Sequence, residues 1–575
     1  MADDAARIET ANGDDERQTL LSVRNLATQF PVRNGLVKAV DGVSFDVHRG
    51  RSLAVVGESG SGKSVTARSI LQIVDAPGRI VSGSMMFTRA DGSTVDLATL
   101  APKGPAIRSI RGREIAMIFQ EPMSSLSPVH TIGDQISEVL RLHLRQSKKE
   151  ARERTIELLR QVEIPNPDTA FDRYTFEFSG GMRQRAMIAM ALACNPTLLI
   201  ADEPTTALDV TTQAEILDLI KRLQQSHGMG VMFVTHDMGV VAEIADDVLV
   251  MYNGKVVEQG PVKQIFHHPV DPYTRMLIGS VLRLEDKAAA RVARAKVSAE
   301  LPPIIETIGL KMYFPAKTAA VKAVDDVSIV VRAGETLGVV GESGSGKTTL
   351  GRCLLRVCQP TGGEVRYRRA DGSVVDLAKA DKQTLMACRR DIRMIFQDPV
   401  SSLNPRMTVT QIIGEPLFVN GIAKGAELED RVAELMRQVG LEPSWRERYP
   451  HAFSGGQRQR IGIARAIALS PRVIVADEAT SALDVSLRSQ MLDLMMQLQD
   501  QLGLAFVFIS HDMGVIRYMC DRVAVMYRGR VVETGDTEQV VNAPRHDYTK
   551  ALLSAIPHPD PSKRRIHERH RYTGN

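Results

Sequence analysis

Length, composition and charge set the first limits on this chain of 575 residues. One hydrophobic core does not support that length, so several domains are expected. The formal net charge of +4, from 72 basic and 68 acidic residues, is too small to indicate a nucleic-acid-binding protein. No apolar stretch approaches the length of a membrane span, and the five cysteines include no C-x-x-C pair. These features predict a cytosolic protein without a secretory signal, a disulfide framework or a zinc site.

A glycine-rich loop occurs twice, because the nine residues VVGESGSGK stand at 55–63 and again at 339–347. Each copy follows an apolar run, precedes a helical pattern and fits the G-x-x-x-x-G-K-[ST] spacing of a phosphate-binding P-loop. Lys63 and Lys347 are expected to reach the terminal phosphates, and the hydroxyls of Ser64 and Thr348 to bind Mg²⁺. The other expected nucleotide-binding residues are Gly57, Glu58, Ser59, Gly60, Ser61 and Gly62 in the first loop and Gly341, Glu342, Ser343, Gly344, Ser345 and Gly346 in the second. A chance glycine-rich turn is not expected twice in this context.

Two serine-glycine turns, Ser179-Gly180-Gly181 and Ser454-Gly455-Gly456, each precede a long helical pattern. One interpretation is a capped helix start, since serine is a good N-cap and glycine leaves the backbone N–H groups accessible. The other is a second anion-binding cradle, separate from the P-loop. The residues themselves leave both open.

Two pairs of adjacent carboxylates, Asp202-Glu203 and Asp477-Glu478, end short apolar strands. Such a pair at a buried strand end is costly unless cations or water occupy it. The aspartate suits water-mediated coordination of Mg²⁺, and the glutamate suits a base that polarises an attacking water. A surface turn is the alternative.

The next apolar strand in each copy ends in a histidine, His236 or His511. A lone histidine there is more often a packed core residue. Its recurrence at the same distance from the acidic pair, on an adjacent strand, favours a functional role.

These landmarks belong to a longer repeat. VKAVD and the P-loop recur with a shift of 284 residues, RADGS with 280, IFQ with 277, and FSGG, ADE and HDMGV with 275. The fixed order and small drift indicate a duplicated domain with short insertions in the first copy. Within each copy, apolar runs alternate with helical patterns, which predicts an α/β fold with a parallel sheet that binds its ligands at the carboxyl ends of the strands.

The ordered set GESGSGK[ST], glutamine, FSGG[MQ]RQR, ADE[PA]T[TS]ALDV and [TS]HD resembles the ATP-binding cassette (ABC) ATPases. Within that superfamily the chain is similar to the oligopeptide/dipeptide importer ATPases, on the segments FQEPMSSLSP, FQDPVSSLNP, HHPVDPYTRMLIGSV and RHDYTKALLSAIP. The fused pair resembles glutathione or peptide importer subunits with both ATPases in one chain. This implies two P-loop domains of ABC type, each with a mostly parallel sheet, an antiparallel β subdomain and a helical subdomain.

The resemblance implies the following boundaries: a disordered N-terminal tail at 1–19, a first ABC ATPase domain at 20–283, a linker at 284–302, a second ABC ATPase domain at 303–558 and a basic C-terminal tail at 559–575. For the last segment a solvated end is favoured over contact with anionic lipid.

In this family ATP lies between the P-loop of one domain and the serine-glycine cradle of the other, which explains why one chain carries two copies. By resemblance, Lys63, Ser64, Gln120, Asp202, Glu203 and His236 face Ser454, Gly455, Gly456 and Gln457. In the same way, Lys347, Thr348, Gln397, Asp477, Glu478 and His511 face Ser179, Gly180, Gly181 and Met182. The first cradle departs from the family pattern, which has glutamine where Met182 stands.

The resemblance also implies roles for the remaining residues. Gln120 and Gln397 are expected to touch Mg²⁺ and water, together with Ser64, Thr348, Asp202 and Asp477. The aspartates of the ALD turns, Asp209 and Asp484, are expected to link the two sites. Phe30 and Phe314 are the expected stackers for adenine, with packing against their own strands as the alternative.

The implied function is hydrolysis of ATP, with Mg²⁺ as cofactor, to drive an importer of peptides or related small solutes. The implied partners are two transmembrane permease subunits and, through them, an external solute-binding protein, with this chain peripheral on the cytoplasmic face of the inner membrane. An iron–sulfur cluster found in some relatives is not expected, because no cysteine lies between Cys194 and Cys353. A ribosome-associated tandem-cassette ATPase is the alternative, and it is disfavoured because such factors lack the two importer-like C-terminal segments.

Overall fold

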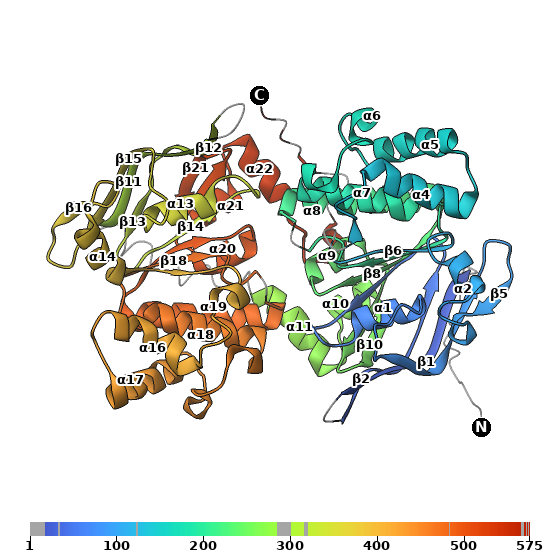
Figure 1. The fold of residues 1–575 in the computed structure, drawn as a ribbon, viewed down its shortest axis with the longest axis horizontal. Coiled ribbons are helices and arrows are strands. Elements are labelled where there is room, and N and C mark those ends of the chain that lie inside the picture. The colour runs from blue at the N-terminus through green and yellow to red at the C-terminus, as the bar shows by residue number, and fades with distance from the viewer. Residues whose placement is uncertain are drawn as a thin grey trace, which may run out of the picture. The chain divides into compact units, whose positions relative to one another are not determined.

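The computed structural model describes residues 18–32, 35–121, 125–206, 208–283, 301–315, 320–481, 483–564, 569–570, 572 and 574 (Figure 1). The expected N-terminal tail and linker lie almost entirely outside these residues. Contacts divide the chain into two units, one of Met1–Thr206 with Ile216–Thr274 and the other of Ala207–Glu215 with Arg275–Asn575. Among the described residues, none of the helices has the length and apolar character that crossing a membrane requires.

The first unit contains two sheets. The antiparallel sheet has the order β2-β1-β4-β5, from β1 (Thr19–Val32), β2 (Gly35–His48), β4 (Arg79–Thr88) and β5 (Thr94–Asp96). The larger sheet has the order β10-β9-β3-β8-β7-β6, from β3 (Ser52–Val56), β6 (Ile115–Ile118), β7 (Leu198–Asp202), β8 (Gly230–Thr235), β9 (Asp247–Tyr252) and β10 (Lys255–Pro261). All its neighbours pair in parallel except the edge hairpin of β9 and β10.

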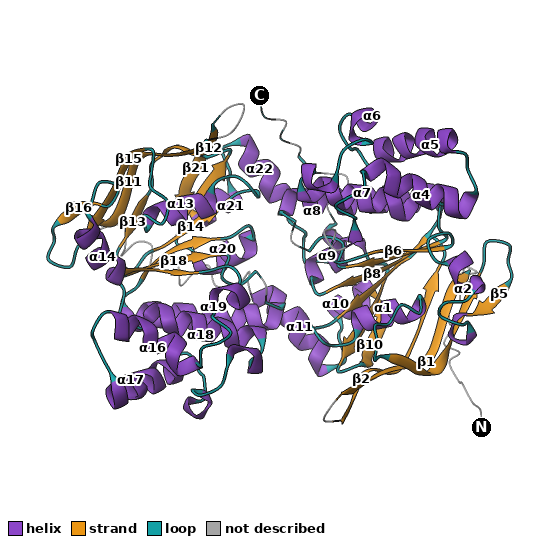
Figure 2. Ribbon diagram, in the orientation of Figure 1, coloured by secondary structure: helices purple, strands orange, loops and turns teal. Residues whose placement is uncertain are grey.

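The helices of this part of the chain are α1 (Lys63–Ile70), α2 (Pro105–Ile110), α4 (Ile132–Leu144), α5 (Lys148–Gln161), α6 (Pro167–Ala170), α7 (Gly180–Leu192), α8 (Val210–His227), α9 (Met238–Ile244), α10 (Val262–His267) and α11 (Pro272–Arg283). Figure 2 shows α4, α5 and α7 grouped on the side of the parallel sheet that lies away from β1 and β2. The cassette therefore has a helical subdomain and an antiparallel β subdomain, with the parallel sheet between them.

The second unit repeats this plan. Its antiparallel strands are β11 (Pro303–Phe314), β12 (Val321–Val327), β13 (Val330–Arg332), β15 (Gly362–Arg368) and β16 (Val374–Asp376), with β12-β11-β15-β16 in order and β13 paired to β11. Its larger sheet has the order β17-β18-β19-β14-β20-β21, from β14 (Thr336–Val340), β17 (Ile392–Ile395), β18 (Val473–Asp477), β19 (Ala505–Ile509), β20 (Arg522–Tyr527) and β21 (Arg530–Asp536). The helices are α13 (Lys347–Leu354), α14 (Lys382–Asp391), α15 (Pro399–Ser402), α16 (Val409–Val419), α17 (Gly425–Gln438), α18 (Gly455–Ile467), α19 (Val485–Leu502), α20 (Met513–Met519), α21 (Thr537–Asn542) and α22 (Asp547–Ser554).

The parallel strands are the core of each unit. All residues of β3, β7, β14 and β18 are buried, because both faces of a parallel sheet are covered and its strands therefore need continuous apolar runs. A P-loop follows the apolar run of β3 and of β14. An acidic pair follows the apolar part of β7 and of β18. The predicted fold class is confirmed.

The C-terminal tail is in part packed. Pro561–Lys563 form a short 3-10 helix in which Pro561 is buried. The ring of Tyr572 lies 5.3 Å from that of Tyr527 and 5.7 Å from that of Tyr548, between centroids. The solvated tail expected at 559–575 therefore does not describe Tyr572, which is partly buried and whose ring packs against two others.

Candidate functional site: two P-loop centres

Two glycines shape the first P-loop at positions where a side chain would be strained and would collide with the backbone. Gly57 and Gly62 have φ angles of +148° and +98°, in the region that L side chains rarely adopt. A Cβ on Gly57 would lie 2.2 Å from the carbonyl oxygen of Met251, and one on Gly62 would lie 2.1 Å from that of Ala39. The loop is thus packed against β9 and β2 and held in one shape.

The lysine of this loop is buried and held by the loop itself. Lys63 is 5% exposed, and its Nζ donates to the carbonyl oxygens of Gly57 at 2.7 Å and Glu58 at 2.8 Å. It is also the first residue of α1, so the positive end of that helix points into the same loop. The arrangement concentrates N–H groups and one ammonium at a single place, which suits a phosphate chain.

The second P-loop has the same geometry. Gly341 and Gly346 have φ angles of +151° and +101°, and an added Cβ would lie 2.2 Å from the Met526 oxygen or 2.0 Å from the Ala323 oxygen. Lys347 is also 5% exposed, and its Nζ donates to Gly341 and Glu342 carbonyl oxygens, both at 2.8 Å. The duplicated sequence therefore yields duplicated loops.

A hydroxyl and a carboxylate meet beside each loop. The Ser64 hydroxyl donates to Asp202 Oδ1 at 2.9 Å, and the Thr348 hydroxyl donates to Asp477 Oδ1 at 3.0 Å. Burial raises the pKa of both aspartates above the usual value, more than these hydrogen bonds lower it. A buried carboxylate with an adjacent hydroxyl fits Mg²⁺, which takes hard oxygen ligands and would stabilise the ionised form. One such pair in each cassette would therefore hold an ion, and the predicted contact of Gln120 or Gln397 with that ion stays a prediction.

The structure brings the predicted glutamine, glutamate and histidine together in the first unit. Gln120 Nε2 donates to Glu203 Oε2 at 2.9 Å, and His236 Nδ1 lies 3.0 Å from Glu203 Oε1. Gln120 follows β6, Glu203 follows β7 and His236 follows β8, and these three strands are neighbours in the sheet. Parallel strands bring their carboxyl ends to one edge, which is why residues far apart in sequence converge here.

The same triad forms in the second unit. Gln397 Nε2 donates to Glu478 Oε2 at 2.7 Å, and His511 Nδ1 lies 3.3 Å from Glu478 Oε1. Burial raises the pKa of Glu203 and of Glu478, but the hydrogen bond from the histidine and its charge outweigh burial, so each pKa lies below its usual value. An ionised glutamate is the form that can accept a proton from water.

Both glutamates have a backbone conformation that is unusual outside glycine. The φ angles are +47° at Glu203 and +46° at Glu478. A non-glycine residue in this region is strained, and such strain persists only where surrounding contacts enforce it. Here the Glu203 N–H donates to the Val234 carbonyl at 2.8 Å, and the Glu478 N–H to the Ile509 carbonyl at 2.9 Å. The turn aims each carboxylate at its glutamine and histidine.

Sequence reasoning missed one partner of these glutamates. The Thr206 hydroxyl donates to Glu203 Oε2 at 2.8 Å, whereas the hydroxyl of its counterpart Ser481 donates to the Glu478 backbone carbonyl at 2.9 Å. The available signal was the difference between TTALDV and TSALDV after the acidic pair. The first glutamate therefore has one more hydrogen-bond donor than the second in these contacts.

The serine-glycine turns are capped helix starts. Ser179 Oγ accepts from the N–H of Met182 at 3.3 Å at the start of α7, and Ser454 Oγ accepts from the N–H of Gln457 at 3.3 Å at the start of α18. Only the second is a capping box, since Gln457 Oε1 also accepts from the Ser454 N–H at 3.0 Å. The cap uses the serine oxygen as an acceptor, whereas anion binding would use the serine O–H and the glycine N–H groups as donors. The two roles are compatible, so the anion-binding cradle stays a prediction.

The remaining predicted residues are placed as follows. The ring of Phe30 lies against Gly78, where an added Cβ would come within 2.4 Å of Phe30 Cε1, whereas Phe314 at the end of β11 is 39% exposed. Asp209 Oδ1 accepts from the N–H of Thr212 at 2.9 Å at the start of α8, and Asp484 is the N-cap of α19. Phe30 is partly buried and Phe314 is exposed, and the adenine-stacking role of both stays a prediction.

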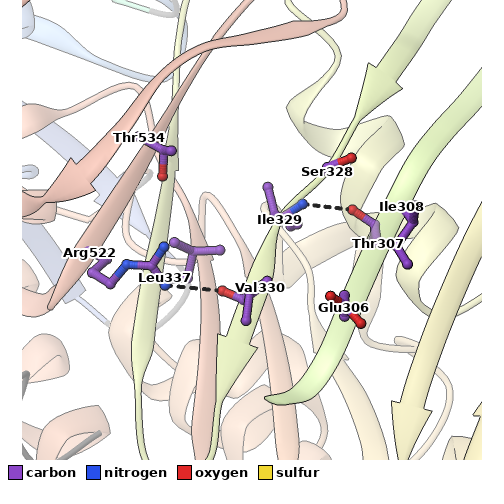
Figure 3. Close-up of a pocket in the computed structure, with 9 residues that line it drawn as sticks. All are labelled: Glu306, Thr307, Ile308, Ser328, Ile329, Val330, Leu337, Arg522 and Thr534. Atoms are coloured by element: carbon purple, nitrogen blue, oxygen red, sulfur yellow. Dashed lines mark hydrogen bonds between the residues drawn. The ribbon is translucent and has the colours of Figure 1, made fainter. Parts of the chain in front are cut away.

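A cavity of about 370 Å³ lies elsewhere in the second unit, among β11, β13, β14, β20 and β21 (Figure 3). Leu337 and Arg522 line it from the starts of β14 and β20, whereas the P-loop follows the end of β14. Arg522 Nη1 donates to the Val330 oxygen at 3.3 Å and to Glu335 Oε1 at 3.0 Å, so its charge is used within the fold. This cavity is separate from the phosphate-binding loop.

With the geometry established, the comparisons with known proteins identify the family. Residues 40–206 and 324–481 match the family model described as ABC transporter, and these two regions contain both P-loops, both cradles and both acidic pairs. The chain belongs to the ABC transporter family. A second model, described as Oligopeptide/dipeptide transporter, C-terminal region, matches residues 257–305 and 532–574. The predicted family, the ATPase class and ATP as ligand are confirmed.

Curated relatives match along nearly the whole ABC chain. The Glutathione import ATP-binding protein GsiA of Pectobacterium atrosepticum is 48% identical over 571 residues, which cover 95% of this chain and 90% of that protein. The protein of the same name from Escherichia coli K12 is 48% identical over 572 residues, covering 95% and 91%. These similarities do not support the ribosome-associated alternative.

Proposed function

We propose that this chain is the ATP-hydrolysing subunit of an importer for peptides or related small solutes, glutathione among them. The observation that supports this most is that the importer-type C-terminal region follows each of the two cassettes. The relatives that match nearly the whole chain are named as glutathione import ATP-binding proteins. The partners proposed with it are two transmembrane permeases and an external solute-binding protein, with the chain peripheral on the cytoplasmic face of the membrane.

In the proposed reaction, each P-loop binds the phosphates of ATP through its N–H groups and through Lys63 or Lys347. Mg²⁺, when bound, neutralises phosphate charge beside Ser64 and Asp202, and beside Thr348 and Asp477. The glutamate carboxylate accepts the proton of the attacking water, while the glutamine and histidine on its two oxygens fix its orientation. The main contribution to the rate enhancement is stabilisation of the charge that develops in the transition state, by groups that are already in position.

We also propose that each P-loop is completed by the cradle of the other cassette, as the resemblance to the ABC ATPases implies. Two copies on one chain then give two sites, and closure on ATP would act on both permeases together. Phe314 remains the better candidate of the two proposed adenine stackers because of its exposed ring.

Reconstitution tests the proposed function. The chain is assembled with candidate permease and solute-binding subunits in proteoliposomes, and uptake of labelled glutathione, dipeptides and tripeptides is measured with and without ATP. We expect ATP-dependent uptake of one of these classes, and ATPase stimulation by the loaded binding protein. Absence of uptake for all three, together with sedimentation of the chain with ribosomes, would contradict the proposal.

The difference between the two cradles gives a further prediction. Gln457 uses its Oε1 in the cap but keeps an amide that can donate, whereas the Met182 thioether donates nothing. One neutral hydrogen bond is worth about 0.5–1.5 kcal/mol, or roughly 2- to 10-fold in affinity or rate. We therefore expect the site built on Lys63, which would face Gln457, to be the tighter or faster one.

The test compares Glu203→Gln with Glu478→Gln in the assembled transporter by single-turnover hydrolysis. Glu203→Gln should reduce the remaining ATPase rate more than Glu478→Gln does. Adding Met182→Gln to each variant should make the two rates more similar. Because Thr206 adds a donor on the same Glu203, Thr206→Val serves as the control that separates the two asymmetries. Equal rates in the two glutamate variants would show that Met182 is only a packing choice.

A further inference from the structure

A tyrosine from beyond each nucleotide-binding core reaches the start of the P-loop. The N–H of Glu58 donates to the hydroxyl oxygen of Tyr273 at 2.9 Å, and the N–H of Glu342 donates to that of Tyr548 at 3.0 Å. Tyr273 lies on α11 and Tyr548 on α22, about 200 residues after the loops they contact. Both tyrosines belong to the regions that match the oligopeptide/dipeptide transporter C-terminal model, outside the ABC transporter matches.

The peptide unit that each tyrosine contacts also holds the P-loop lysine. The peptide between Gly57 and Glu58 donates its N–H to Tyr273 and accepts from Lys63 Nζ on its carbonyl oxygen at 2.7 Å. The corresponding peptide of Gly341 and Glu342 donates to Tyr548 and accepts from Lys347 Nζ at 2.8 Å. A continuous line of hydrogen bonds therefore runs from the tyrosine through one planar peptide to the ammonium.

The tyrosines are themselves held in place by elements of the same C-terminal regions. Glu258 on β10 accepts the N–H groups of Val270 and Asp271 at 2.9 and 3.0 Å, which fixes the turn before α11. Glu533 on β21 accepts those of Arg545 and His546 at the same distances before α22. An identical arrangement in two copies that differ elsewhere is not expected of incidental contacts.

The rings add a second restraint. Tyr273 packs on Tyr252 and Tyr548 on Tyr527, with ring centroids 4.4 Å apart in both pairs. Tyr548 is 1% exposed, and Tyr572 from the tail covers it further. Tyr273 is only partly buried, so its ring is held less closely than that of Tyr548. In both pairs the stacked tyrosine restrains the direction of the hydroxyl, so the hydroxyl can define the position of the loop.

We infer that Tyr273 and Tyr548 are positioning residues for the ATPase reaction: each hydroxyl fixes the first peptide of its P-loop and, through it, the phosphate-binding lysine. The C-terminal region is then part of the nucleotide site. The inference rests on ATP binding by the cassettes and is independent of which solute is imported.

Paired substitutions test this in the full-length chain. Tyr273→Phe with Tyr548→Phe removes only two oxygens and keeps both rings. We expect the KM for ATP to rise about 2- to 10-fold, the size of one lost hydrogen bond to a loop N–H, with kcat changed less than about twofold. ATP affinity from equilibrium titration should fall by the same factor, while the Tm of the nucleotide-free protein stays close to that of the parent. The matched control is Tyr252→Phe with Tyr527→Phe, which removes hydroxyls from the neighbouring rings.

A third pair, Glu258→Gln with Glu533→Gln, loosens the turns that present the tyrosines. The glutamine pair should raise the KM for ATP less than the Tyr273→Phe, Tyr548→Phe pair does. A chain with both of these pairs should have the same KM as the phenylalanine pair alone, since both act through the same hydroxyls. An unchanged KM in the phenylalanine pair, or an equal rise in the matched control, would overturn the inference. Additive effects of the glutamine and phenylalanine pairs would overturn the part that assigns the glutamates to the tyrosines.

Discussion

Replacing either P-loop lysine by alanine is expected to abolish transport. Lys63 and Lys347 are buried and point into their loops, so each variant loses a charge-assisted contact to phosphate worth about 1.5–3 kcal/mol, or roughly 10- to 150-fold in affinity. It also leaves two loop carbonyls without their donor. ATP binding and uptake in proteoliposomes measure the two consequences separately.

The matched controls are Lys255→Ala and Lys379→Ala, which remove lysines whose side chains are 65% and 71% exposed from the same two cassettes. They should transport at the parental rate. If Lys63→Ala or Lys347→Ala also did so, the requirement for two working sites would be wrong.

Changing the two glutamates proposed as catalytic bases, Glu203 and Glu478, to glutamine should separate ATP binding from hydrolysis. Glu203 and Glu478 are held by a glutamine and a histidine, and their pKa values lie below the usual value, so they are ionised at neutral pH and able to accept a proton. An amide cannot accept that proton. General-base catalysis contributes about 10²- to 10⁴-fold, and we expect phosphate release to slow by at least the lower of these factors.

The double variant should still bind ATP with near-parental affinity, as measured by equilibrium titration, because neither side chain is in the P-loop. Glu427→Gln, at an exposed position of α17, controls for the loss of a charge. Rapid multiple turnover by the Glu203→Gln, Glu478→Gln chain would remove both residues from the catalytic role.

Sequence alone predicted the parts of the centre that are local. The P-loop needs glycine at a few backbone positions and a lysine and hydroxyl just after them, and these lie within eight consecutive residues. The convergence of Gln120, Glu203 and His236 was also predictable, because each follows a parallel strand and such strands end at one edge of a sheet.

The contacts that the sequence did not predict are long-range or depend on the orientation of a side chain, and neither can be determined from a local motif. Thr206 and Ser481 occupy matching positions and carry the same hydroxyl, yet one contacts a side chain and the other a carbonyl. Tyr273 and Tyr548 gave no local signal of their contacts, since each partner lies about 200 residues away. Likewise Tyr572, in a basic stretch typical of solvated tails, packs on the rings of Tyr527 and Tyr548 in the preceding domain.

The duplication within one chain has a consequence for how the two centres can change over generations. In an ATPase assembled from two identical chains, every substitution alters both centres in the same way, so the two centres keep the same sequence. Here the residue after one cradle can be Met182 and after the other Gln457, and the hydroxyl beside one glutamate can turn to its carboxylate while the other turns to a carbonyl. Fusion in one chain therefore allows the two centres to acquire different properties that are inherited together. It also allows either centre to be inactivated by mutation while the other keeps its natural sequence.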